Sequence, residues 1–158
     1  MTNPIRPIAI PLFLLCAGCG AAALPQRYPS RPPAGMTAAQ AEEGERACVA
    51  IAAHATVERA WAYIGCMVSK GHTVGVAFRV RGETTRLYVT QTRPHEPAVI
   101  ASELTDCRKS AYAAGRSERG STQEQIVERM ASAFRACVDP LGYTVQREAT
   151  PAPSRPGR

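Results

Sequence analysis

Residues 73–91 read TVGVAFRVRGETTRLYVTQ, and this stretch decides the fold of the chain. Apolar and polar residues alternate on both sides of Gly82-Glu83, with the period of two that is typical of strands with one buried face. Glycine in the first central position favours a two-residue type II′ turn, so the stretch predicts an antiparallel β-hairpin. Pairing Arg81 with Thr84 collects the apolar residues of both strands on one face.

Two helices are expected before the hairpin. Thr37 and Gln40 fit a capping box at the start of the first helix, in which side chains satisfy free backbone N–H groups. The second helix is expected over residues 57–69, with Thr56 as its N-cap. It is apolar over most of its circumference, which predicts a central position in the core.

Two more helices are expected after the hairpin. Pro97 opens the third helix. Ser121 and Glu124 fit a second capping box before the fourth helix, which stops at Asp139 where a proline follows. A further short strand is expected over residues 143–147.

The segments 62–74 and 133–145 share a pattern. In each, an aromatic residue precedes Cys by three positions, Gly follows Cys by five, and a ring-bearing residue, Thr and Val come next. We interpret each segment as a helix end, a left-handed glycine and the start of a strand. The chain then contains two helix–helix–strand units, 37–91 and 98–148, within one domain over residues 37–148. The alternative is chance similarity between two Ala-rich helices.

The cysteines support this division into two units. The chain has six: Cys16, Cys19, Cys48, Cys66, Cys107 and Cys137. The last four allow three pairings, and an even number is typical of proteins in an oxidising compartment. One cysteine falls on each helix of each unit, so we expect the bridges Cys48–Cys66 and Cys107–Cys137. The predicted fold is α+β, with two helix-hairpin units, each joined by a disulfide, around a small antiparallel β-hairpin.

The start of the chain has the features of a secretory signal. Residues 8–15 form an apolar run, and the small residues Ala17-Gly18 follow just before Cys19. The run is much shorter than the about 20 residues that a membrane span requires. The sequence LLCAGC resembles the lipobox of bacterial lipoproteins, although Cys16 stands where leucine is usual. The resemblance implies cleavage after Gly18 and acylation of Cys19.

Membership of that class implies an exported protein held on a bacterial membrane by its N-terminal lipid. Gly20 agrees with a position on the outer membrane facing the periplasm. The expected organisation is then a signal peptide over 1–18, the lipidated cysteine with a Pro/Ala-rich tether over 19–36, and a disordered tail over 149–158. An ordinary cleaved signal without lipid, and translation from Met36, are the alternatives.

A second resemblance lies inside the domain. Cys66-Met67, followed by Gly71-His72, resembles a pattern found in small proteobacterial lipoproteins. That resemblance is short and implies no activity.

Composition excludes some functions. The formal net charge is +6, but the cations are spread along the chain rather than clustered, so we expect no nucleic-acid partner. The chain has no GxSxG nucleophile elbow, and we expect no catalytic residues and no cofactor. A competing hydrolase would use His95 with Glu96 or Glu103.

A metal site is the third alternative. Two thiolates and two imidazoles from Cys48, His54, Cys66 and His72 would suit zinc. Disulfide formation in an oxidising compartment competes with this role for both cysteines, so we expect no metal.

The polar face of the predicted hairpin provides a candidate binding site, formed by Arg79, Arg81, Arg86 and Tyr88. In the expected register Arg79 lies opposite Arg86, which is unfavourable for like charges and would be relieved by a bound anion. The alternative is a solvated face of a one-sided sheet. We therefore expect a non-enzymatic accessory protein with a binding or structural role at a periplasmic membrane face. An anionic envelope component or an acidic protein is the expected partner.

Overall fold

A computed structural model describes residues 28–55, 58–116 and 120–147. The elements follow in the order β1 (Ser30–Arg31), α1 (Ala38–His54), α2 (Arg59–Ser69), β2 (Thr73–Val80), β3 (Glu83–Gln91), α3 (Pro97–Arg116), α4 (Gln123–Val138), a 3-10 turn (Asp139–Leu141) and β4 (Tyr143–Arg147). The strands form one antiparallel sheet in the order β1-β2-β3-β4. The expected α+β fold and the short strand after α4 are confirmed.

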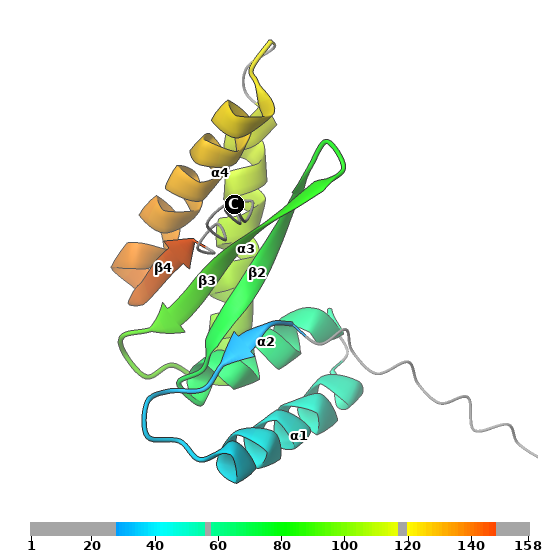
Figure 1. Ribbon diagram of the computed structural model, residues 1–158, viewed down its shortest axis with the longest axis vertical. Helices are drawn as coiled ribbons and strands as arrows, with labels where there is room; N and C mark the ends of the chain where they lie inside the picture. Colours follow the sequence, from blue (N-terminus) through cyan, green and yellow to red (C-terminus); the bar gives the residue numbers. More distant parts are fainter. Residues whose placement is uncertain (1–27, 56–57, 117–119, 148–158) are drawn as a thin grey trace, which may run out of the picture.

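The helices lie on one side of the sheet. Figure 1 shows α3 and α4 side by side behind β2, β3 and β4, with α1 and α2 at the lower end of the sheet. The side chains between sheet and helices are buried, and Phe78 of β2 meets Phe134 of α4 edge to face at 5.2 Å between ring centroids. The opposite face of the sheet, called the outer face below, carries no helix in this view.

The hairpin register differs from the expected one by two residues. Val80 pairs with Glu83, so Arg81 and Gly82 are the two central residues of the turn. Their φ angles of 49° and 89° are both positive, which is typical of a type I′ turn and not of the predicted type II′. A shift of two residues leaves every side chain that stays within the paired strands on its expected face. The predicted apolar face is therefore confirmed although the predicted register is wrong.

Helix starts follow the expected chemistry with small displacements. The capping box of Thr37 and Gln40 is present at α1. At α4 the box is formed by Thr122 and Gln125, one residue later than expected, because the Gln125 side chain accepts from the Thr122 backbone N–H at 2.9 Å. The helix expected over 57–69 begins at Arg59 and has no side-chain cap, and Thr56 lies outside the described residues.

The domain begins earlier than the sequence indicates. β1 pairs with β2, and the Gly75 backbone N–H donates to the Pro29 carbonyl at 2.8 Å. The ring of Tyr28 lies 6.3 Å from that of Tyr63 in α2. Residues 28–31 therefore contribute to the sheet and core, although they were assigned to the tether expected over 19–36.

The two similar segments have the same local structure. Gly71 and Gly142 both have left-handed backbones, with φ of 81° and 91°, and each follows a helix and precedes a strand. The ring-bearing residues after them, His72 and Tyr143, are both buried. The strands that follow, β2 and β4, flank β3 on its two sides.

Candidate functional site

Both expected disulfides are present. Cys48 is bonded to Cys66, which joins α1 to α2, and Cys107 is bonded to Cys137, which joins α3 to α4. The Cα–Cα distance is 5.5 Å in each bridge. Two disulfides indicate an oxidising, non-cytoplasmic location.

The zinc alternative is wrong, because the sulfurs of Cys48 and Cys66 are bonded to each other and are not free thiolates. Within residues 28–55, 58–116 and 120–147, no cluster of three or more His, Cys, Asp or Glu side chains is arranged to hold a metal. None of the helices in these ranges is long and apolar enough to cross a membrane. Cys19, the expected lipidation site, lies outside them.

Three residues on the outer face of the sheet are positively charged. The strand registers place on this face Arg31, Thr73, Gly75, Ala77, Arg79, Thr84, Arg86, Tyr88, Thr90, Thr144 and Gln146. Among these residues, Arg31, Arg79 and Arg86 are positively charged and none is acidic. The outer face is therefore basic, with hydroxyl and amide groups between the arginines.

Two details of the predicted anion site are wrong. Arg79 pairs with Thr84 and Arg86 with Ala77, so the two arginines are diagonal neighbours and not directly opposed. The like-charge repulsion invoked for that pair is correspondingly weaker. Arg81 does not join the face, because it lies in the turn and its guanidinium donates to the Ser121 carbonyl at 3.1 Å.

β1 adds a residue to this face that the sequence did not indicate. The guanidinium carbon of Arg31 lies 4.7 Å from the centroid of the Tyr88 ring, a cation–π contact that covers the buried tyrosine. On the same face, the hydroxyls of Thr73 and Thr90 are hydrogen-bonded at 2.6 Å. These contacts hold side chains of neighbouring strands in fixed positions around the charged groups.

α3 closes the edge of β2 beyond the point where β1 ends. The Nε of Arg108 donates to the Ala77 carbonyl at 3.2 Å, and the Arg79 backbone N–H donates to the Tyr112 hydroxyl at 2.9 Å. The Arg108 guanidinium also lies 5.5 Å from the centroid of the Trp61 ring in α2. Arg108 and Tyr112 therefore satisfy backbone groups that an edge strand otherwise leaves open.

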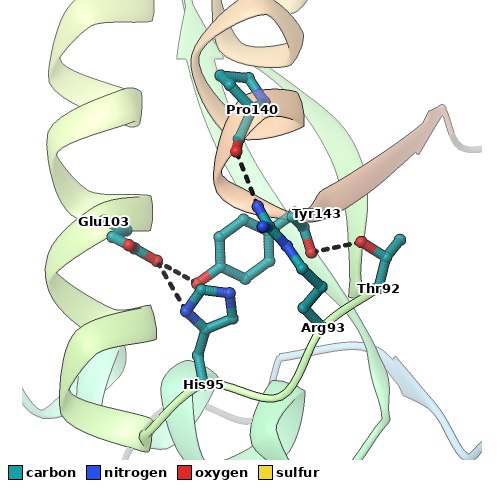
Figure 2. A network of polar contacts seen from close by, with 7 residues as sticks. Thr92, Arg93, His95, Glu103, Pro140 and Tyr143 are labelled. Atoms are coloured by element: carbon teal, nitrogen blue, oxygen red, sulfur yellow. Dashed lines mark hydrogen bonds and ion pairs between the residues drawn. The ribbon is translucent and has the colours of Figure 1, made fainter.

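His95 is brought next to Glu103, as the hydrolase alternative requires. Its Nδ1 lies 3.9 Å from Glu103 Oε2, and its ring stacks on Tyr143 at 5.4 Å between centroids. The Tyr143 hydroxyl donates to the same carboxylate oxygen (Figure 2). Burial, the hydrogen bond to Glu103 and the negative charge of Glu103 together raise the pKa of Tyr143 above its ordinary value.

The loop that carries His95 is fixed to the end of α4. The Thr92 backbone N–H and hydroxyl both donate to the Gly142 carbonyl, at 2.8 Å and 2.9 Å. Arg93 donates to the Pro140 carbonyl at 2.9 Å, as Figure 2 shows. These bonds give the cluster a structural role, joining β3, α3 and the start of β4.

Two side chains of this cluster share the Glu103 carboxylate. The Glu103 carboxylate already accepts from Tyr143, whose raised pKa keeps the hydroxyl protonated. The other ring nitrogen of His95, Nε2, is buried and has no hydrogen-bond partner among the described residues. Glu96, the other carboxylate of the hydrolase alternative, is exposed.

A groove opens between the helices at the lower end of the molecule. It has a volume of about 560 Å³ and is lined by Ile51, Ala55, Glu58, Trp61, Ala62, Pro97, Ala98, Ala101, Ser102, Thr105, Asp106 and Lys109. α1 and α3 both pack on α2, and the groove lies between them over the N-terminal part of α2. No sequence pattern indicated this groove, because its lining comes from three helices whose relative positions no local pattern fixes.

His72 is the buried histidine of the domain. It is 2 % exposed, neither ring nitrogen has a hydrogen-bond partner, and Gly44 of α1 passes over it. Burial lowers the pKa of His72, Glu45 opposes the shift, and Lys70 adds to it. The imidazole is therefore held neutral in the core and is not placed as a ligand.

Comparison with known proteins adds no relative: no family model, no curated protein and no solved structure matches the chain.

Proposed function

We propose that the chain is an exported, non-enzymatic lipoprotein, acylated at Cys19 and tethered to a membrane, that binds an anionic component of the envelope through its outer face. The observation that carries the proposal is the composition of that face. Its charged residues in the described strands are Arg31, Arg79 and Arg86, and no carboxylate lies among them.

The two disulfides and the resemblance of LLCAGC to a lipobox support export and lipidation. The position of β1 supports a location of the outer face close to the membrane. The chain enters the described domain at residue 28, and β1 follows at once at the edge of the sheet. A tether running from Cys19 to Tyr28 spans about nine residues, or roughly 30 Å when extended. An outer face attached to a membrane by so short a segment remains close to the lipid surface.

Electrostatics favour an anionic partner for this face. Each Arg near an anionic lipid surface contributes about 1 kcal/mol, and its planar donors fit phosphate or carboxylate oxygens. The groove and the His95 cluster lie on other parts of the molecule, so this binding role does not depend on them.

Binding to lipid vesicles tests the proposal. The full chain with Cys19→Ser carries no acyl chain, and we expect it to bind vesicles that contain phosphatidylglycerol and not vesicles of phosphatidylcholine alone. The double variant Arg79→Gln/Arg86→Gln should bind about thirtyfold more weakly. A pull-down on purified peptidoglycan, run in parallel, tests the carboxylate-bearing polymer as the anion.

The matched control removes the same number of positive charges from residues outside the outer face. Arg46→Gln/Arg116→Gln removes two exposed arginines from α1 and α3, and we expect it to bind almost as well as the parent. Equal weakening by both double variants, or no binding to vesicles and peptidoglycan, would contradict the proposal.

A further inference from the structure

The groove between α1, α2 and α3 has the dimensions of a site for a linear ligand. Its lining on α3 runs from Pro97 to Lys109, three turns of helix and roughly 18 Å along the axis. The volume of about 560 Å³ lies within the range of small-molecule sites. A helix of the same length occupies roughly 1,400 Å³, so the space favours a single extended chain over a docked helix.

Apolar side chains from α2 and α3 make up much of the lining. Trp61, 6 % exposed, and Ala62 come from α2, and Ala98 and Ala101 come from α3. A side chain at Gly65 would collide with the Pro97 carbonyl, so α2 and the start of α3 are in close contact beside the groove. The walls are thus held by backbone packing and by the Cys48–Cys66 bridge.

One of the exposed large hydrophobic side chains lies at the groove. Among the described residues, the large hydrophobic side chains that remain exposed are Ile51, at 50 %, and Val99, at 44 %. Ile51 lines the groove, whereas Val99 lies on α3 outside the lining. Exposed apolar surface at a concave site is typical of a binding surface.

The rim carries charges of both signs. Glu58 lies at the start of α2, and Asp106 and Lys109 form an ion pair of 3.0 Å on α3. Such a rim complements a head group with both an ammonium and a phosphate better than it complements a single carboxylate. We propose that the groove binds the acyl chain of a zwitterionic single-chain phospholipid, with the chain on Trp61 and the head group at this rim.

Trp61 makes the proposal directly testable, because it is the one tryptophan of the chain. The probe is lysophosphatidylethanolamine with a brominated acyl chain, added below its micelle concentration to the full chain with Cys19→Ser. Bromine quenches tryptophan fluorescence on contact. We expect saturable quenching, and weaker binding of a brominated free fatty acid.

Two exposed positions of α1 provide a matched pair of variants. Ile51→Glu places a charge on the groove wall and should weaken binding about tenfold. Ala53→Glu makes a comparable change at an exposed position outside the lining and should leave it unchanged. Thermal melting of both variants checks that each is folded.

Absence of quenching, or equal binding by the two variants, would overturn the groove as the site. Tighter binding of the fatty acid than of the lysophospholipid would overturn the assigned head group. A cationic amphipathic peptide that changes Trp61 fluorescence where the lipid does not would identify a helix as the occupant and would also overturn the proposal.

Discussion

Arg108 joins the helices to the sheet through Trp61: its guanidinium lies 5.5 Å from the Trp61 ring while its Nε donates to a carbonyl of β2 at 3.2 Å. These two contacts of one side chain link α2, α3 and the edge of β2. Arg108→Met keeps most of the aliphatic length but leaves the Ala77 carbonyl without this donor. We expect a loss of about 2 kcal/mol in the free energy of unfolding, measured by urea titration.

The exposed Arg116 at the end of the same helix gives the control. Arg116→Met removes an equal charge and should change the free energy of unfolding by less than about 0.5 kcal/mol. A similar effect of both substitutions would show that Arg108 acts through net charge alone.

Tyr143 is expected to make stability sensitive to alkaline pH. Its pKa is raised in the folded protein, so the unfolded chain loses the phenolic proton first. The stabilisation is complete below pH 10, the ordinary value, and is lost as the pH rises above it. Urea unfolding between pH 8 and 11, within the reach of standard buffers, measures this slope.

Tyr143→Phe removes that titration and the bond to Glu103. We expect it to cost about 1 kcal/mol at neutral pH and to flatten the alkaline slope. Glu103→Gln, which retains an acceptor, should cost less. An unchanged slope in Tyr143→Phe would assign the alkaline effect to other groups.

His72 is expected to make stability sensitive to acidic pH, in contrast to the alkaline effect of Tyr143. Its pKa in the folded protein lies below the ordinary value of 6.5, so the unfolded chain binds a proton more readily. The stabilisation is complete above pH 6.5 and is lost as the pH falls toward the folded pKa. Glu45 and Lys70, the charged groups that influence the ring, partly offset one another.

Urea unfolding at pH 7.5 and at pH 5 measures this loss, and His72→Phe should reduce it because the ring cannot be protonated. His54→Gln changes an exposed histidine and should leave the loss unchanged. A parent protein equally stable at both pH values would refute the assignment.

The disulfides are expected to contribute similar amounts. They close loops of 18 and 30 residues, for which the entropy of the unfolded chain predicts about 3 and 4 kcal/mol. The double variants Cys48→Ala/Cys66→Ala and Cys107→Ala/Cys137→Ala, unfolded in urea, test this. Loss of stability in only one of the two double variants would show that the disulfides do not contribute equally to stability.

Structural features that are encoded by neighbouring residues could be predicted from the sequence. Helices and strand faces follow from spacing within a few residues, and the cysteine pairs follow from the match between the two similar segments; the structure agrees with all three. The predicted hairpin register was wrong because two registers that differ by two residues place the strand side chains on the same faces. Only the backbone conformation of the turn residues Arg81 and Gly82 distinguishes the two registers.

Features built from distant segments were not predictable. β1 depends on two residues with no strand pattern of their own, and Arg108 carries no signal for its bond to Ala77. The sequence match between Tyr143 and His72 indicated neither the burial of both rings nor the partner Glu103. The groove depends on the angle between helices, which the side-chain pattern of one helix does not specify.

The intact mass of the protein purified from the producing cell's membranes tests export, lipidation and disulfide formation together. We expect a chain that starts at Cys19, carries acyl groups on that residue, and gains mass with a thiol reagent only after reduction. A soluble chain that retains residues 1–18, bears no lipid and reacts at its cysteines without reduction would contradict the account.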